Sequence, residues 1–522
     1  MRIISVDRAA ILIEDGWTVS TAGFTESGHA EAVSGAIEQR FLATGRPRDL
    51  TLLYAAGQGD RISKGTGRYG HKGLVRRIIG SHWGAAPRLG ALAVANEIEA
   101  HNWPQGVIAQ LYRAIAGGKP GVITAIGLHT FVDPRYEGGR LNSRTTESLI
   151  ELIPLAGREW LFYPSLPIDC AIIRGTTADE RGNITMEHEA FHQDVLPLAQ
   201  AAHNSGGIVI VQVKRLAKAG TLNPNLVKVP GILVDYVVVC ENAEDHWMTY
   251  REQHNPAYCG EEREPEHAFK PLPLDVRKVI QRRAFFELQK LASPIANLGV
   301  GIPAGVGQIA REEGHTDFTL TLESGPIGGI PAQDRFFGAA TNPEAIIDQA
   351  AQFDFYDGGG LDISFLGLAE LDAQGNINVS RFGDKVAGIG GFVNISQTAK
   401  NLVFMGTMTA KGLEVKISDG RLSIVREGAV KKIVPKVEQL SFNGPYVAAL
   451  DINVVYVTER AVFRLVNGRL TVTEIAPGVD LLRDVLDQCA TPIAVAADLQ
   501  RMGSRIFFDG PMRVAPRTET EK

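Results

Sequence analysis

The feature that most constrains the fold of this chain is an internal repeat. Residues 49–57, DLTLLYAAG, align with residues 317–325, DFTLTLESG, at an offset of 268 residues (317 − 49). Residues 169–185, DCAIIRGTTADERGNIT, align with residues 362–378, DISFLGLAELDAQGNIN, at an offset of 193 (362 − 169). Ordered repetition indicates one structural unit that occurs twice. The first copy carries 75 additional residues (268 − 193) between its two matched segments.

The first copy alternates between helix-like and strand-like patterns. Apolar spacing predicts helices over 6–14 and 30–43 and strands over 17–22 and 50–55. Strand, loop and helix in succession require crossover connections, which produce a mostly parallel sheet covered by helices. We therefore predict an α/β fold made of two similar, open, mostly parallel α/β domains.

A charged stretch that contains prolines separates the two copies. It runs over 259–273, CGEEREPEHAFKPLP, between a strand-rich and a helical region, and is typical of an interdomain linker. The predicted divisions are an N-terminal domain with the additional segment, a linker and a C-terminal domain, at residues 1–258, 259–274 and 275–522.

Composition excludes several classes of function. The chain has 522 residues, of which 44% are hydrophobic and 21% charged, as expected for a soluble protein with more than one core. A net charge of −6 and short charge runs argue against binding to nucleic acid. The N-terminus lacks an apolar signal region and no run of about 18 apolar residues occurs, so we expect a cytoplasmic protein without a membrane segment.

Cysteine and histidine spacing does not suggest a metal site. The four cysteines are Cys170, Cys240, Cys259 and Cys489. They have no CxxC spacing and no paired histidine cluster, which argues against zinc binding and against a disulfide framework. The 12 histidines show neither a triad arrangement nor the HExxH motif, so we predict no metal ligands.

One acid stands out within 318–331, FTLTLESGPIGGIP. Alternating apolar residues predict a strand through Glu323, and the turn that Gly325 introduces leaves the carboxylate at the carboxyl end of that strand. Open α/β sheets bind ligands at such ends. A buried structural acid and a functional acid are both compatible with this pattern. The repeat favours function, since Ala55 occupies the matching position in the first copy.

Three glycine-containing loops offer further candidates. Residues 297–303, NLGVGIP, precede a predicted helix over 304–312 and either bind an anion with their N–H groups or only permit a turn. Residues 388–391, GIGG, offer donors to an oxyanion, although a structural turn is the simpler interpretation. Gln105 provides an amide within 102–107, NWPQGV, where an isolated glutamine is usually solvated.

Motifs along almost the entire chain resemble one known family. They are DGWTVSTAGFTESGHAEAV, GLVRRIIGSHWG, NWPQGVI, GGKPGVIT, GLHTFVDPR, PIDCAIIRGTTADERGN, NLGVGIP, ESGPIGG, QFDFYDGGGLDISFLGLAELDAQGN and SFNGPYVA. Together they resemble the single-chain family I CoA-transferases, most closely the acetate and propionate CoA-transferases. The family's nucleophilic acid lies in an E-x-G-x-x-G motif, which is intact here as Glu323, Gly325 and Gly328.

The same resemblance implies the remaining site residues. Near the thioester oxygen it places Gln105 and the backbone of Gly390 or Gly391. Near CoA it places Gly299, Val300, Gly301 and Lys400. Trp103 departs from the leucine that is usual in relatives, and we expect this change to alter the acyl pocket.

The implied reaction transfers CoA between a short-chain acyl-CoA, such as acetyl- or propionyl-CoA, and a short-chain carboxylate. It proceeds by a ping-pong mechanism through a glutamyl-CoA thioester on Glu323. CoA is then a substrate that is transiently covalent, no tightly bound cofactor is needed, and the protein is expected to be a homodimer or homotetramer. The intermediates hydrolyse in water, so we expect the active site to be closed in the cleft between the two domains.

Two alternatives remain. An acyl-CoA hydrolase on the same scaffold would replace the acceptor acid by water. A ligand-binding or regulatory module without catalysis would use the same α/β framework, but the intact Glu323 motif argues against it.

Overall fold

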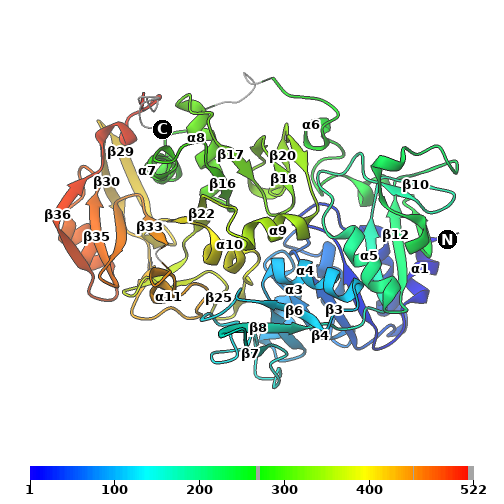
Figure 1. Ribbon diagram of the computed structural model, residues 1–522. Coiled ribbons are helices and arrows are strands. Elements are labelled where there is room, and N and C mark those ends of the chain that lie inside the picture. Colours follow the sequence, from blue (N-terminus) through cyan, green and yellow to red (C-terminus); the bar gives the residue numbers. More distant parts are fainter. Residues whose placement is uncertain (266–270, 451, 515–522) are drawn as a thin grey trace.

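The computed structural model describes residues 1–265, 271–450 and 452–514, and its two large sheets correspond to the two halves of the sequence (Figure 1). In Figure 1 the first half, coloured blue to green, lies to the right and the second half lies to the left. The two-domain α/β prediction is confirmed.

The first sheet has eight strands in the order β1-β15-β12-β9-β2-β3-β4-β5. Every neighbouring pair is parallel. The strands are β1 (Arg2–Ile3), β2 (Thr18–Thr21), β3 (Leu50–Tyr54), β4 (Val75–Gly80), β5 (Glu99–Asn102), β9 (Cys170–Arg174), β12 (Ile208–Val213) and β15 (Tyr236–Val239). The fully buried sequence CAIIR of β9 suits a central strand that helices cover on both faces.

The second sheet has ten strands in the order β21-β18-β17-β16-β22-β27-β33-β34-β35-β36. Its parallel centre consists of β16 (Ile295–Leu298), β17 (Thr319–Thr321), β22 (Ile363–Gly367), β27 (Asn401–Met405) and β33 (Asn453–Val457). Antiparallel pairs join this centre to β18 (Pro326–Ile327) and β21 (Ala345–Ile346) on one side and to β34 (Ala461–Val466) and β35 (Arg469–Ile475) on the other, and β36 (Ala494–Arg501) follows β35.

Strand order bears out the internal repeat. The order β3-β2-β9-β12-β15 in the first half recurs as β17-β16-β22-β27-β33 in the second. The 75 additional residues of the first half supply β4, β5, and the separate sheet of β6 (Gly121–Thr124), β8 (Arg158–Pro164) and β7 (Glu151–Leu155). The second half has an addition of its own beyond β33, which the sequence did not predict because it lies outside the repeat.

Helices cover both sheets. In the first half they are α1 (Val6–Leu12), α2 (Glu31–Thr44), α3 (Pro87–Val94), α4 (Gln105–Ala116), α5 (Val195–Asn204) and α6 (Pro256–Cys259). In the second half they are α7 (Val276–Gln289), α8 (Val306–Glu312), α9 (Gln349–Asp357), α10 (Phe392–Thr398) and α11 (Gly444–Ala448). Local chemistry fixes several starts: Asp275, for example, caps α7 by accepting a hydrogen bond from the backbone N–H of Lys278.

The two halves pack closely through α4, which contacts α9 and α10 (Figure 1). Gly106 permits this approach, since a Cβ at that position would lie 2.4 Å from the ring of Phe353. The backbone N–H of Gly106 also donates to Asn394 Oδ1 at 3.1 Å. One continuous apolar core therefore contains residues of both halves, including Val107 and Phe353.

The predicted linker over 259–274 falls between the two sheets. Its first residue, Cys259, ends α6, and α7 begins at Val276. Residues 266–270 of the linker lie outside the described residues, and the domain boundaries stay a prediction.

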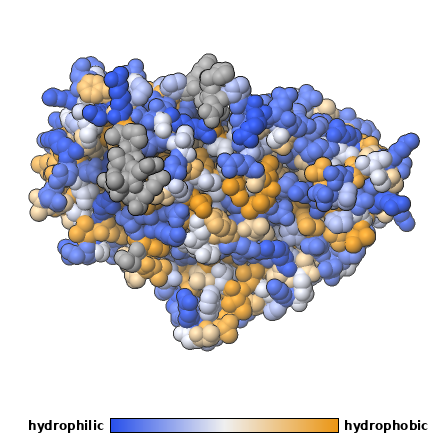
Figure 2. Space-filling view, turned by 45° about the horizontal axis from the view of Figure 1, so that its top comes forward, coloured by the Kyte–Doolittle hydropathy of each residue, from blue (hydrophilic) through white to orange (hydrophobic). Residues whose placement is uncertain are grey.

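Hydrophilic residues cover most of the face in Figure 2, with hydrophobic residues in scattered groups. Across the described residues, no helix combines the length and apolar character that a membrane span requires. All four cysteines are free; Cys170 and Cys489 are buried, whereas Cys240 and Cys259 are half-buried.

Candidate active site

Glu323 lies in a turn at the carboxyl end of β17. The strand predicted through this acid forms only over Thr319–Thr321, because the backbone N–H of Gly325 turns back to donate to the carbonyl of Leu322 at 3.0 Å. Gly325 has a φ of 120°, and a Cβ there would lie 2.0 Å from the carbonyl oxygen of Ile347. Only glycine fits this turn, which presents Glu323 beyond the sheet edge.

The carboxylate of Glu323 is half-buried and unpaired. Within the described parts of the chain, no group donates a hydrogen bond to it or forms an ion pair with it. Burial raises its pKa to about 7. An acid kept only for structure is normally hydrogen-bonded, so this environment favours the functional interpretation.

Two cavities meet at Glu323. They have volumes of about 120 and 210 Å³ and share four lining residues, Glu323, His82, Val300 and Gly390. The smaller cavity is lined mainly by the first half, including Phe24, Gly57, Arg61 and Gln105. The larger is lined almost entirely by the second half, including Gly299, Leu366, Gly391 and Phe392. The carboxylate therefore lies at the junction of the two halves.

The GIGG loop is held against the first half. The backbone N–H of Gly390 donates to the carbonyl of Ser81 at 3.0 Å, and the carbonyl of Gly390 accepts from the backbone N–H of Gln105 at 3.0 Å. Gly391 has no such partner: its N–H donates to no protein atom within the described residues. A Cβ at Gly391 would lie 2.2 Å from Glu323 Oε2, so this loop directly abuts the carboxylate. Of the two predicted donors, only the N–H of Gly391 is free to bind an oxyanion.

Gln105 is the first residue of α4 and is buried, not solvated as an isolated loop glutamine would be. Its Nε2 donates to Gln349 Oε1 at 3.2 Å, and Gln349 Nε2 donates to Asp194 Oδ2 at 2.8 Å. Burial raises the pKa of Asp194 to about 8. This chain of hydrogen bonds orients both amides and leaves one N–H of Gln105 for a substrate.

The NLGVGIP loop follows the carboxyl end of β16 and reaches both cavities through Val300. Gly299 continues the sheet by donating its N–H to the carbonyl of Phe365 at 2.9 Å. The side chain of Val300 is 48% exposed, and Gly301 faces open space with a φ of 88°. The predicted helix over 304–312 starts as a 3-10 turn at Pro303–Gly305 and is α-helical only from Val306.

Lys400 is not brought to this site. It immediately precedes β27, at the amino-terminal edge of the parallel strands, whereas Glu323 follows the carboxyl edge. A strand of five residues separates these edges by roughly 15 Å. Its side chain is 62% exposed, and Nζ pairs with Asp362 Oδ1 at 2.8 Å. The assignment of Lys400 by short-motif resemblance is therefore not supported by its position.

Several lining residues were missed by the sequence analysis, above all His82. This side chain lies just beyond the end of β4, a strand in the additional segment, and burial together with Arg61 lowers its pKa to about 4. His82 is thus neutral at neutral pH. Trp103, in contrast, is fully buried against Tyr163 with ring centroids 5.4 Å apart and lines neither cavity. The expected change to the acyl pocket at this position is not seen.

Comparison with known proteins decides the family. The model of the coenzyme A transferase family matches residues 3–240. The chain is 49% identical over 514 residues to caffeate CoA-transferase of Acetobacterium woodii, covering 97% of this chain and 98% of that protein. This chain is a single-chain family I CoA-transferase.

Other relatives of this CoA-transferase agree. It is 43% identical over 513 residues to acetate CoA-transferase YdiF of Escherichia coli K12, covering 98% of this chain and 96% of that protein. The crystal structure of the acyl-CoA transferase YdiF apoenzyme from E. coli O157:H7 superposes with a TM-score of 0.93 at 42% identity, covering 98% and 97% of the two chains. A structure of YdiF as a thioester complex with CoA superposes with a TM-score of 0.92 at 41% identity and the same coverage.

Proposed function

We propose that this CoA-transferase moves CoA from a short-chain acyl-CoA, such as acetyl- or propionyl-CoA, to a short-chain carboxylate, with Glu323 as the covalent carrier. The observation that carries the proposal is an unpaired carboxylate of raised pKa where two cavities of the two halves meet. The thioester complex with CoA described for YdiF supports a covalent intermediate.

The first half-reaction forms the carrier. An oxygen of the Glu323 carboxylate attacks the thioester carbonyl of the acyl-CoA, the C–S bond breaks, and CoA leaves as a thiolate. The product is a mixed anhydride of Glu323 and the donor acid. The thiolate then attacks the glutamyl carbonyl, which forms a glutamyl-CoA thioester and releases the donor carboxylate.

The second half-reaction reverses these steps with the acceptor. The acceptor carboxylate attacks the glutamyl thioester, the thiolate leaves, and a new mixed anhydride forms. The thiolate attacks the acceptor's carbonyl, which gives the new acyl-CoA and regenerates the carboxylate of Glu323. The reaction needs no ATP, because one thioester is exchanged for another.

Each addition produces an oxyanion that needs preorganised donors. We assign this role to the free N–H of Gly391 and to the second amide N–H of Gln105. Gly390 instead positions the loop, since its own N–H is occupied by Ser81. Removal of one such donor typically raises the barrier by about 3 kcal/mol.

We assign the CoA arm to the larger cavity, because Gly299 and Val300 of the NLGVGIP loop line it. Gly301 lies at the open end of the same loop, and Lys400 is left out. The acyl group then occupies the smaller cavity, which has apolar walls from Phe24 and Phe337 and a volume of about 120 Å³. This volume favours short acids. A homo-oligomeric state and a cytoplasmic location stay predictions.

Mass spectrometry and a thiol assay test the proposal. Incubation with acetyl-CoA should add the mass of CoA, less one water, to the peptide that contains Glu323. Free thiol should not accumulate, with or without added propionate, while propionyl-CoA forms only with propionate. Thiol release that is independent of an acceptor acid would indicate the hydrolase, and the absence of any adduct under trapping conditions would indicate direct transfer. An acceptor panel that ranks caffeate above acetate and propionate would overturn the assignment of the small cavity.

A further inference from the structure

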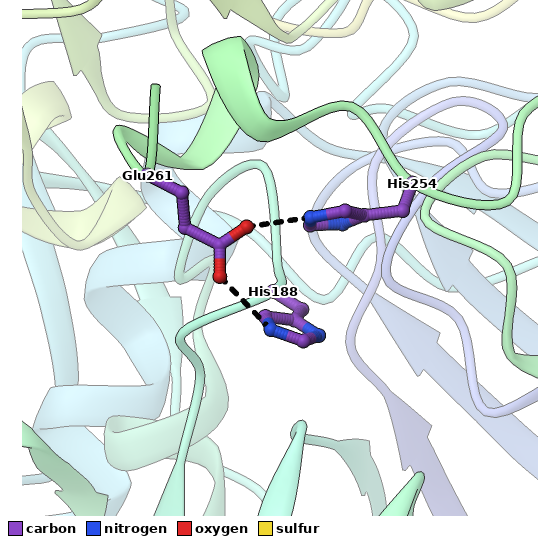
Figure 3. A group of neighbouring side chains, drawn as sticks. All are labelled: His188, His254 and Glu261. Atoms are coloured by element: carbon purple, nitrogen blue, oxygen red, sulfur yellow. Dashed lines mark hydrogen bonds and ion pairs between the residues drawn. The ribbon is translucent and has the colours of Figure 1, made fainter.

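A cluster of two histidines and one glutamate lies outside the active site (Figure 3). Glu261 Oε1 is 3.0 Å from His188 Nε2, and Glu261 Oε2 is 2.6 Å from His254 Nε2. The two imidazole rings have centroids 4.6 Å apart. One potential ligand atom from each of the three residues lies within 4.8 Å of the others.

The cluster joins the first half to the start of the predicted linker. His188 belongs to the loop between β11 (Ile184–Thr185) and α5, whereas His254 and Glu261 flank the short helix α6. Glu261 also lines a separate cavity of about 480 Å³. This cavity shares no lining residue with the two cavities at Glu323, so the cluster is a distinct site.

We propose that His188, His254 and Glu261 bind a divalent metal ion. The ligand set suits Zn²⁺ best, with a fourth coordination position open to water or a small ligand. Two imidazoles and one carboxylate are a common set of protein ligands for Zn²⁺ when one coordination position stays open. The hydrogen bond of His254 to Glu261 and the close approach of His188 to Glu261 would be exchanged for coordinate bonds to the ion. The side chains are 20%, 26% and 39% exposed, so an ion can enter from solvent.

The surroundings of the two imidazoles differ in how well they suit the ligand form. The Nδ1 atom of His254 is buried without a hydrogen-bond partner within the described residues, so the ring is free to carry its proton there. Lys214 Nζ lies 3.4 Å from His188 Nδ1 and, as an ammonium group, can only donate there, so Lys214 must turn away before the His188 proton can move to Nδ1 and free Nε2 for an ion. Lys214 therefore sets an upper limit on affinity.

The bound ion would fasten the loop at His188 to His254 and to Glu261 at the start of the predicted linker. Its expected effect is on stability, because the cluster touches neither cavity at Glu323. The proposal does not depend on the substrate of the enzyme.

Equilibrium dialysis with elemental analysis tests this site on the full chain. After treatment with a chelator, the wild type should bind one Zn²⁺ per chain and melt at a higher temperature when Zn²⁺ is present. His254→Ala and Glu261→Gln should each lower the affinity for Zn²⁺ more than about 100-fold. A loss of this size exceeds the effect of removing a residue that only hydrogen-bonds a metal ligand, so it indicates direct coordination. Both variants should keep normal CoA transfer.

Two matched variants sharpen the result. His203→Ala removes an exposed histidine of α5 outside the cluster and should leave Zn²⁺ binding unchanged. Lys214→Met removes the opposing cation and should tighten binding several-fold. The proposal is overturned if the wild type binds no stoichiometric Zn²⁺ or if His254→Ala and Glu261→Gln bind it as the wild type does. Zn²⁺ binding by His188→Ala that is as tight as in the wild type would remove His188 from the ligand set.

Discussion

The two halves of this CoA-transferase share a strand order and differ at the position that matters for chemistry. Beyond β17 the chain presents Glu323, whereas beyond the equivalent β3 it presents Ala55. Small residues in the first half make room: a Cβ at Gly57 would lie 2.6 Å from His82 Nδ1. A duplicated framework has thus been divided into one half that carries the proposed nucleophile and one half that builds the pocket around it.

The difference shows why a cleft between similar halves suits covalent transfer. The acid comes from one half, while Gln105, which is held through Gln349 to Asp194, reaches the same cavity from the other. Each half alone would expose its groups to water. Packed together, they raise the pKa of Glu323 and restrict access by water.

Glu323→Gln removes the contribution of the second half and should have the largest effect. We expect kcat to fall by at least about 10⁴-fold, as for loss of other covalent nucleophiles, and the CoA adduct to disappear. Steady-state transfer from acetyl-CoA to propionate measures the loss. Glu344→Gln, an exposed acid of the same half that lines neither cavity, is the control and should behave as the wild type. Near-normal transfer by Glu323→Gln, in protein free of deamidation, would refute the assignment.

Gln105→Ala removes the contribution of the first half. Loss of one oxyanion donor should lower kcat by about 10² to 10³-fold with little change in KM. Gln110→Ala tests a glutamine on the same helix that pairs with Asp357 at 2.8 Å and lines neither cavity; its kinetics should stay close to normal. An effect confined to KM would show that Gln105 binds substrate without acting on the transition state.

Because the pKa of Glu323 is raised, ionisation of this carboxyl group should lower the free energy of unfolding. The pKa of this carboxyl group rises from an ordinary value of 4.5 to about 7 in the folded state. Between these two pH values the folded state therefore keeps a proton that the unfolded chain has lost. The contribution of Glu323 to the free energy of unfolding is therefore fully present below about pH 4.5 and is lost as the pH rises through about 7. Glu323→Gln should be more stable than the wild type above pH 7, by at most about 3 kcal/mol, with no difference near pH 4.5. Denaturant unfolding at several pH values measures this; a difference that grows at low pH would contradict the predicted shift.

Gly57→Ala and Gly325→Ala compare equivalent turns and should give the smallest kinetic effect. Gly325→Ala strains a φ of 120° against the carbonyl of Ile347, so it should lower the melting temperature strongly. Gly57→Ala has no positive φ and should mainly displace His82, which would lower kcat about tenfold. Melting curves and kinetics on both proteins separate the two effects. Equal losses of stability together with unchanged kcat in Gly57→Ala would show that both turns serve only the fold.

The sequence predicted much of the fold because its signals are local. Apolar periodicity located β2, β3, α1 and α2 to within a few residues, and the repeat gave the topology of both halves. The strands beyond β33 were missed, since they lie outside the repeat. His82 was missed because β4, the strand that positions it, was not predicted.

The amino-acid sequence alone determined the duplicated α/β framework and singled out Glu323, since both depend on patterns that persist along the chain. Only the tertiary structure decided which groups converge. In the folded chain the N–H of Gly390 donates to the carbonyl of Ser81, whereas the N–H of Gly391 has no partner among the described residues. Lys400 lies away from the site and pairs with Asp362. It also joined His188 to residues beyond position 250. The reason is physical: hydrogen-bond partners and distances between remote segments follow from packing, which spacing in the sequence does not encode.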